Sequence, residues 1–266
     1  MIGHENLVNL FKKLVDNNKL SHAYLFFGDP EIGKFLFAHS LANYLEKGPL
    51  AGRQGVFEKP TAILEELLII SPNEKGIISI NEVRNLPHFL YQKPVFSKKR
   101  IVIINDSENM TSEAQNAVLK IVEDSPEMAL IIFISKTEDL LLPSLLSRLQ
   151  KIYFPKLSSE KIEQFLLFNF PAQAGRAKEI SEISFGRIGR AIKLAENQSA
   201  NWQIKYTDID EAVENNQIDE FFEFLIIDFR RDLVKNSSKI KEVMKRLVFI
   251  KSLNTNKKLQ MKAAIQ

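Results

Sequence analysis

A short run of residues, GDPEIGK (28–34), has the composition and spacing of a phosphate-binding loop. Gly28 and Gly33 let the backbone approach a phosphate closely, while backbone amides and the start of a following helix favour negative charge. Lys34 can reach the β and γ oxygens of a nucleotide, but Phe35 stands where a serine or threonine hydroxyl would bind Mg²⁺. The spacing predicts a phosphate loop without its hydroxyl ligand, although glycine-rich turns between a strand and a helix also occur for packing reasons alone.

A second part of a nucleotide site is expected at the end of the apolar run IVIIN (101–105). There, a nucleotide hydrolase carries an aspartate that orients Mg²⁺ and a glutamate that activates water. In this sequence the pair is Asn105 and Asp106, a neutral amide and a carboxylate one methylene shorter than glutamate. Because both Mg²⁺ contacts are replaced, we expect a fold derived from an ATPase that no longer hydrolyses ATP. No cofactor is required, and ATP or ADP could bind only weakly, through loop amides and Lys34.

The composition bounds the remaining possibilities. The chain has 266 residues, 45% of them hydrophobic, and a net charge of +3, which is too small to indicate a nucleic-acid binder by itself. There are no cysteines, and the four histidines are scattered without ligand spacing, so we expect no metal site. The sequence contains neither a signal peptide pattern nor an apolar run of about 18 residues. A cytoplasmic protein without membrane contact is expected.

The order of apolar segments indicates an α/β fold. An amphipathic helix is predicted over 5–20, with further helical patterns over 80–92 and 111–123. Continuously apolar runs, typical of parallel strands buried on both faces, lie between them. These runs are AYLFF (23–27), LLII (67–70), IVIIN (101–105), ALIIFIS (129–135) and KIYF (151–154). Residues 1–155 are therefore expected to form a doubly wound parallel sheet.

Beyond Pro155 only helical patterns remain. We predict a small helical domain over 156–198 and a third, helical domain over 199–266, joined by the polar stretch 197–201. The last 34 residues, 233–266, contain nine Lys or Arg and one acidic residue, a local charge of +8. This basic segment favours contact with another subunit, while contact with DNA phosphates or a solvated face stay open as alternatives.

Four stretches of this sequence resemble a known family. They are Ile2-Gly3-His4 with the following helix, SHAYLFFGDPEIGK (21–34), MTSEAQNAVLKIVEDSP (110–126) and LLPSLLSRLQKIYF (141–154). They are similar to the delta-prime subunits of bacterial DNA polymerase III clamp loaders, which belong to the AAA+ superfamily. The likeness covers most of residues 1–195 and is weaker beyond, where 254–266 resembles part of the collar. It implies an AAA+ domain, a helical lid and a collar domain shorter than usual.

The resemblance also implies a role for Ser147 and Arg148. Family members carry a Ser-Arg-Cys motif that presents its arginine to ATP bound by the neighbouring subunit, and here it reads Ser147-Arg148-Leu149. Arg148 is thus expected to act in trans as an arginine finger. The alternative is that Arg148 caps a helix or pairs with a carboxylate on its own surface.

Two further positions match the family's sensors, Ser135 at the end of the fourth predicted strand and Arg190 in GRIGRA (186–191). Because the site that they would serve is degenerate, we expect both to be structural. The four-cysteine zinc module that the family commonly carries is replaced here by the loop-like segment 48–60.

Three functions compete at this point. The first is a non-hydrolysing clamp-loader subunit of the DNA polymerase III holoenzyme. Its partners would be ATPase subunits, a delta subunit, the sliding clamp and, through the complex, primed DNA. The second is a working AAA+ ATPase subunit whose loop tolerates Phe35, and the third is a generic nucleotide-binding α/β protein. A defective loop combined with an intact Ser147-Arg148 favours the first.

Overall fold

The computed structural model describes residues 3–47, 57, 59, 63–196, 218, 221–222, 225–226, 229, 233–252 and 257–265. The chain divides into two compact units, Met1–Ile192 and Lys193–Gln266, and each is described by itself. The division into domains at residues 155 and 198 stays a prediction. Among the described residues, no helix has the apolar length that a membrane crossing requires.

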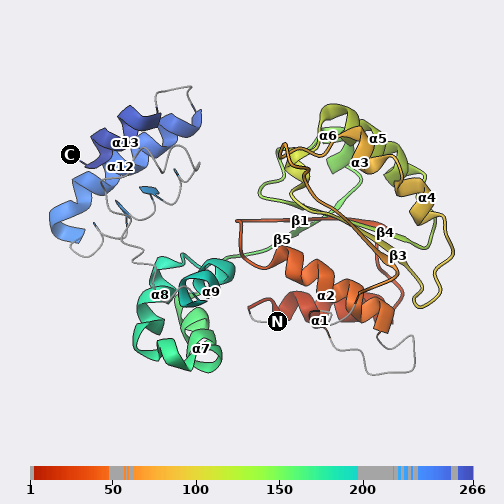
Figure 1. Ribbon diagram of the computed structural model, residues 1–266, viewed down its shortest axis with the longest axis horizontal. Helices are drawn as coiled ribbons and strands as arrows, with labels where there is room; N and C mark the ends of the chain where they lie inside the picture. Colours follow the sequence, from red (N-terminus) through yellow and green to blue (C-terminus); the bar gives the residue numbers. More distant parts are fainter. Residues whose placement is uncertain are drawn as a thin grey trace. The chain divides into compact units, whose positions relative to one another are not determined.

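The first unit contains a five-stranded parallel sheet with the strand order β2-β3-β4-β1-β5 (Figure 1). All five strands coincide with the predicted apolar runs to within one residue at each end, which confirms the α/β class. Their bounds are Ala23–Phe27 (β1), Leu67–Ile70 (β2), Arg100–Ile104 (β3), Ala129–Ser135 (β4) and Gln150–Tyr153 (β5).

Helices cover both faces of this sheet (Figure 1). In β3, Val102 and Ile104 belong to one buried cluster, whereas Ile101 and Ile103 belong to the other, because successive side chains of a strand point to opposite faces. The helices α1 (Glu5–Asp16) and α2 (Lys34–Lys47) cover one face. The other face carries α3 (Ile80–Val83), α4 (Leu86–Leu90), α5 (Ser112–Glu123) and α6 (Pro143–Leu146).

A cluster of aromatic rings fixes β1 against α1, α2 and the end of β5. The rings of Phe11, Phe26, Phe37 and Phe154 are fully buried. The ring centroid of Phe26 lies 5.6 Å from those of Phe11 and Phe37 and 5.2 Å from that of Phe154. These distances fall within the range in which aromatic pairs add stability beyond their buried area. The packing therefore holds the segment between β1 and α2 in place.

Two predicted helices differ from the observed ones. The pattern over 80–92 is split into α3 and α4, with Pro87 in the first turn of α4. Proline lacks the amide hydrogen that a continuous helix would need at this position. The helix predicted over 5–20 ends at Asp16, and Asn18 then adopts a φ of +54°. Asparagine accepts this left-handed conformation more readily than most residues, so it ends the helix early.

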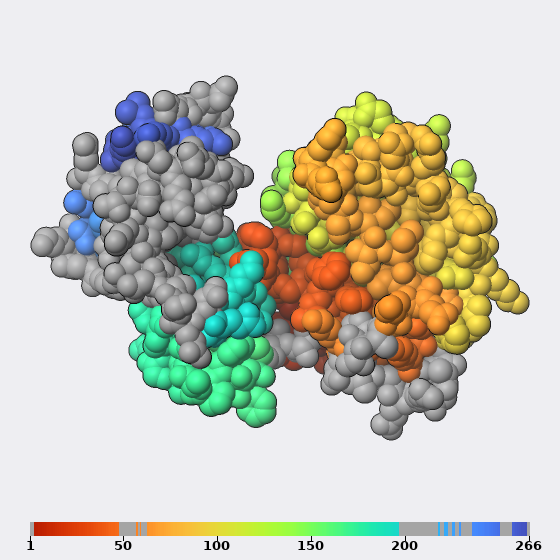
Figure 2. Space-filling model, viewed as in Figure 1, coloured from red at the N-terminus to blue at the C-terminus, as the bar shows by residue number. Residues whose placement is uncertain are grey.

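The segment after β5 is helical, as predicted. It contains α7 (Ser159–Asn169), the 3₁₀ helix η3 (Pro171–Arg176), α8 (Ala177–Ile183) and α9 (Ile188–Glu196). In the space-filling view these helices are green to cyan, while the orange and yellow segment between α2 and β3 covers much of the visible face of the α/β part (Figure 2).

The second unit contains α12 (Leu233–Ser252) and α13 (Lys257–Ile265), which pack around a small apolar cluster. Val243, Met261 and Phe222 are buried in this cluster. The expected joint at 197–201 lies outside the described residues, as does most of the predicted third domain before residue 233.

Candidate functional site

The phosphate loop follows β1 and runs close to the end of β5. Gly28 has a φ of +139°, and a Cβ atom on it would lie 2.4 Å from the carbonyl oxygen of Phe154. Gly33 has a φ of +98°. Both conformations favour glycine over residues with a side chain. The two glycines of the motif are thus needed by the backbone path itself, whether or not the loop holds a phosphate.

Lys34 is buried, and its ammonium group is turned onto the loop. Its Nζ donates hydrogen bonds to the carbonyl oxygens of Gly28 and Asp29, both at 2.6 Å. Burial lowers the pKa of Lys34 to about 8, while the nearby carboxylates of Glu108 and Asp106 act in the opposite direction. With this pKa the side chain is still mostly charged at neutral pH. The lysine therefore donates its hydrogen bonds to carbonyl oxygens of the loop itself. Carbonyl oxygens carry partial negative charge, so they are not groups that bind phosphate.

Phe35 stands where the hydroxyl ligand is expected. It lies in the first turn of α2, on an exposed side of this helix. Its side chain is 37% exposed, and its ring centroid lies 5.7 Å from that of His39. A benzyl group in this place offers no oxygen to a metal ion. The loss of one Mg²⁺ contact at this position stays a prediction.

Three contacts from elsewhere in the first unit hold the loop. Nε2 of His4 lies 2.8 Å from the carbonyl oxygen of Ile32, and burial lowers the pKa of this histidine. The backbone amide of Gly189, in α9, donates to the carbonyl oxygen of Glu31 at 2.8 Å. Lys156 forms an ion pair with Asp29 at 2.6 Å. The start of α9 and the segment after β5 are therefore bonded directly to the loop.

The strand-end pair lies beside the loop, at the carboxyl end of β3. Asn105 donates through Nδ2 to Oδ2 of Asp106 at 3.0 Å, and Asp106 has a φ of +49°. The hydroxyl of Ser107 donates to the carbonyl oxygen of Ile134 at 3.0 Å, which fixes the turn to the end of β4. Asp106 lies close enough to Lys34 to act on its pKa. The side-chain amide of Asn105 donates its hydrogen bond to Asp106.

Glu108 is a site residue that the sequence reasoning missed. Its side chain is only 6% exposed, and its Oε1 lies 3.7 Å from Nζ of Lys136. It also interacts electrostatically with Lys34 more strongly than Asp106 does. An available signal was the second acidic residue in the run NDSE (105–108), directly after the strand.

The two sensor positions have protein partners. Ser135 is 1% exposed and donates to the carbonyl oxygen of Thr137 at 2.7 Å. It is paired with Phe27 across the sheet, so it lies next to the start of the phosphate loop. The guanidinium of Arg190 lies over the ring of Phe185 at 5.8 Å, in the helix whose first turn contacts the loop. Both side chains contact other groups of this chain, and their purely structural role stays a prediction.

Ser147 and Arg148 lie at a different place, before β5 begins. Because the sheet is parallel, the start of β5 is at the opposite edge from the loop that follows β1. Arg148 donates from Nη1 to the carbonyl oxygen of Ser144 at 2.7 Å and to the hydroxyl of Ser147 at 3.2 Å. Its Nη2 pairs with Oε1 of Glu123 at 2.5 Å. The predicted residues therefore form two separate regions, the loop region and the Arg148 region.

The ion pair of Arg148 is a surface pair, with side chains 41% and 38% exposed. Exposed pairs contribute roughly 0.2–1 kcal/mol. Glu123→Gln is therefore expected to leave the thermal unfolding midpoint nearly unchanged.

Glu66→Gln provides the contrast, because Glu66 is 1% exposed, pairs with Arg100 at 3.0 Å and accepts hydrogen bonds from two backbone amides. Neutralising Glu66 should lower the thermal unfolding midpoint clearly. A large decrease of the midpoint in Glu123→Gln would contradict the prediction and show that the Arg148–Glu123 pair stabilises the fold.

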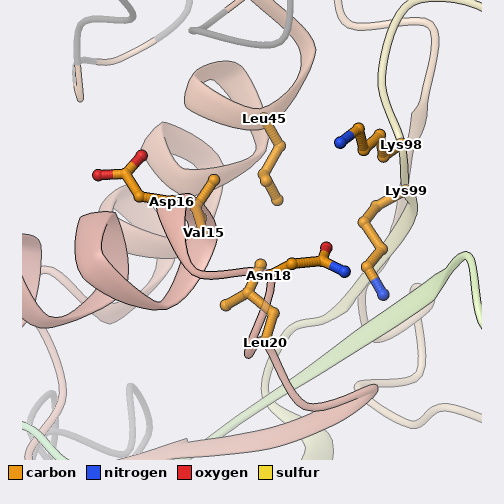
Figure 3. A pocket seen from close by; sticks show the side chains of 7 residues that line it. All are labelled: Val15, Asp16, Asn18, Leu20, Leu45, Lys98 and Lys99. Carbon is orange, nitrogen blue, oxygen red and sulfur yellow. The ribbon is translucent and has the colours of Figure 1, made fainter.

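Two cavities lie away from the phosphate loop. One of about 240 Å³ is at the amino-terminal edge of the sheet, where Asn18, Leu20, Leu45, Lys98 and Lys99 converge and the carboxylate of Asp16 points away (Figure 3). The other, about 480 Å³ and open, is lined by Pro143, Leu146, Ser147, Leu149 and Lys151. The second cavity places a concave surface next to Arg148.

Comparison with known proteins agrees with this architecture. Residues 3–158 match the family model described as DNA polymerase III, delta subunit. The DNA polymerase III subunit gamma/tau of Mycobacterium bovis is 30% identical over 159 residues, which cover 56% of this chain and 27% of that protein. The corresponding subunit of Mycoplasma genitalium is 24% identical over 243 residues, covering 85% of this chain and 40% of that protein. The chain thus spans less than half the length of these two relatives.

A solved structure extends the likeness to nearly the whole chain. It is that of a DNA polymerase III gamma subunit-related protein from Thermotoga maritima, with a TM-score of 0.50, 19% identity and 96% of each chain covered. Similarity at this identity concerns the fold. The architecture is therefore of the AAA+ type, and the chain belongs to the family described as DNA polymerase III, delta subunit.

Proposed function

We propose that this chain is a delta-prime-type subunit of the DNA polymerase III clamp loader and does not hydrolyse ATP itself. In this proposal it assembles in the cytoplasm with ATP-hydrolysing subunits and a delta subunit, and helps them to load a sliding clamp onto primed DNA. Its chemical contribution is the guanidinium of Arg148, which would stabilise negative charge on ATP bound by a neighbouring subunit. Family membership supports the clamp-loader part of this proposal.

The observation that carries the non-hydrolysing part is the state of Lys34. In a working loop this lysine binds β and γ phosphate oxygens. Here both of its hydrogen bonds, at 2.6 Å, go to carbonyl oxygens of the loop, and the next residue is Phe35. A nucleotide would have to break these contacts and would still lack the hydroxyl ligand for Mg²⁺, the ion that neutralises charge during phosphoryl transfer.

The Arg148 region supports the second part. The Arg148 side chain is 41% exposed and lies beside an open concave surface. It forms an ion pair with the half-exposed carboxylate of Glu123 and donates hydrogen bonds to Ser144 and Ser147. Such a pair is weak enough to exchange its carboxylate for a phosphate of another subunit. Glu123 would then hold the guanidinium in place until the neighbour binds.

A working ATPase is the second candidate, because the carboxylates of Asp106 and Glu108 both act on Lys34. An acidic group close to the phosphate loop is what a hydrolase uses to activate water. In this second candidate function, Glu108 would take the role of the missing glutamate. It lies two residues after Asp106, the position where that glutamate is expected.

Reconstitution separates the two candidates. The isolated chain is expected to show no ATP turnover, while a complex of ATP-hydrolysing clamp-loader subunits, delta subunit and sliding clamp on primed DNA should load the clamp only when this chain is added. Turnover in that complex should survive Lys34→Ala, with thermal unfolding of the variant as the control for its stability. Steady-state phosphate release and clamp loading are the measurements. Turnover by the purified chain alone would contradict the proposal.

A further inference from the structure

The cavity of about 240 Å³ at the amino-terminal edge of the sheet has an apolar wall (Figure 3). This wall consists of Val15 at the end of α1, Leu20 in the segment before β1 and Leu45 in α2. Leu45 is buried in the core on this face of the sheet, and Val15 and Leu20 pack against the same core. The apolar side of the cavity is therefore a part of the core that a ligand could reach.

The polar side of the cavity carries positive charge. Lys98 and Lys99 contribute two ammonium groups, and the side-chain amide of Asn18 extends toward them (Figure 3). Asp16 is the acidic residue of the lining, and its carboxylate points away from the cavity. In the part of the chain that the structure describes, neither lysine forms an ion pair with a carboxylate. The cavity therefore presents cations and an amide next to an apolar wall.

One of these ammonium groups is partly removed from water. Lys99 is half-buried, and its Nζ donates a hydrogen bond to the backbone carbonyl oxygen of Glu127 at 2.7 Å. Burial lowers the pKa of Lys99, while the charge of Glu127 acts in the opposite direction. An ammonium group has three donors, so this bond leaves donors for an anion in the cavity. Such an anion would replace part of the hydration that Lys99 has lost.

The backbone that carries these polar groups is held in place. Ser97 Oγ donates to the carbonyl oxygen of Lys99 at 2.5 Å and accepts from the amide of the same residue at 3.0 Å. The turn before it is fixed by the buried carboxylate of Glu66, which accepts two backbone amides of that turn. On the other side, the amide of Asn18 donates to the carbonyl oxygen of Val15 at 3.0 Å. A ligand would therefore meet a preorganised site, which keeps the entropic cost of binding low.

We propose that this cavity binds a carboxylate carried on a short aliphatic chain, with the carboxylate at the two ammonium groups and the chain against the apolar wall. A bare inorganic anion would leave the apolar wall unused, and a neutral apolar ligand would bury the ammonium groups without a partner. The chain must be short, because drug-sized ligands occupy cavities of about 300–1,000 Å³. The carboxyl terminus of a polypeptide that ends in an aliphatic residue and a free aliphatic acid share this chemistry. This site lies apart from the phosphate loop and from Arg148, and it does not depend on the function proposed above.

Titration of the full chain with N-acetyl-leucine tests the proposal, with the leucine and valine methyl groups labelled for nuclear magnetic resonance. Saturable shifts are expected for the methyl groups of Val15, Leu20 and Leu45. N-acetyl-leucinamide has nearly the same shape without the charge and should bind at least about tenfold more weakly. Lys98→Met keeps the aliphatic stem and removes one of the two cations, so it should weaken the binding of N-acetyl-leucine about three- to tenfold.

Lys93→Met is the matched control. Lys93 is an exposed lysine of the same segment before β3, but it does not line the cavity, so its replacement should leave the affinity unchanged. Two further probes distinguish the sources of the carboxylate. Equal affinity for 4-methylpentanoate and N-acetyl-leucine assigns the site to free aliphatic acids, whereas clearly tighter binding of a short peptide that ends in leucine assigns it to a chain terminus. Thermal unfolding of each variant controls for its stability.

The proposal is overturned if N-acetyl-leucine causes no saturable shift of these methyl groups, or if the acid and the amide bind equally well. It is also overturned if inorganic phosphate binds as tightly as N-acetyl-leucine, because the apolar wall would then contribute nothing. Equal effects of Lys98→Met and Lys93→Met would show that general surface charge, and not the cavity, attracts the carboxylate. These titrations use the isolated chain, so their result is independent of whether Arg148 acts on a neighbouring subunit.

Discussion

Replacing Arg148 by alanine is expected to lower DNA-stimulated ATP hydrolysis by the reconstituted complex at least about tenfold, a conservative part of the ~10³–10⁵ range for an arginine supplied in trans. The variant withdraws charge from a neighbouring active site and leaves the core of this chain intact. Its own contacts are those to Glu123, Ser144 and Ser147, all at the surface. Steady-state turnover of the complex, with and without primed DNA, measures the effect.

Two variants serve as controls for this result. Arg148→Lys keeps the charge but loses the planar fork that binds two phosphate oxygens, so turnover should recover only in part. Arg176→Ala removes an arginine of similar exposure, 36%, which is paired with Glu179 at 3.7 Å, and should have no effect. Turnover that survives Arg148→Ala but is lost in Lys34→Ala would place the active site in this chain and support the working-ATPase candidate.

The second large effect is expected at Gly28. A Cβ atom there would lie 2.4 Å from the carbonyl oxygen of Phe154 and 2.9 Å from Cδ1 of Ile32, and the φ of +139° is strained for any residue with a side chain. Gly28→Ala should therefore lower the free energy of unfolding by on the order of 3–5 kcal/mol, the sum of backbone strain and overpacking. The near-ultraviolet circular dichroism signal of the aromatic cluster, followed during thermal or urea unfolding, reports the loss.

Gly33→Ala separates the two causes. Its φ of +98° is also strained, but a Cβ atom there would meet no atom within 4 Å among the described residues. The expected loss is about 1–3 kcal/mol, from strain alone. If both variants lost the same stability, the close approach of Gly28 to the end of β5 would not be the cause.

The sheet was predictable from local sequence because each strand is a short apolar run. Runs such as ALIIFIS (129–135) are buried on both faces, a pattern typical of parallel strands under two layers of helices. The break between α3 and α4 was less visible, since the apolar spacing over 80–92 continues through it. The spacing of apolar residues shows which face of a helix is buried. It does not show that Pro87 lacks the backbone amide hydrogen that a continuous helix needs.

The residue types and their spacing indicate which residues belong to the candidate site, but they say less about how its side chains are directed. The glycine spacing identified the loop, and Phe35 identified its missing ligand. The direction of the Lys34 side chain could not be read from the sequence, because it depends on the two loop carbonyl oxygens to which its Nζ donates. Glu108 was missed for the same reason, since its burial results from tertiary packing and not from local spacing.

The strand order has a consequence for the synthesis of this protein. β1 is at Ala23–Phe27, yet its two neighbours in the sheet are β4 and β5, which begin at Ala129 and Gln150. A ribosome therefore releases AYLFF long before either partner strand exists. During that time the strand has unpaired edges and an apolar surface, the features that expose a nascent chain to aggregation and to chaperones. Such long-range pairing also slows folding, because the loop between the strands must close first.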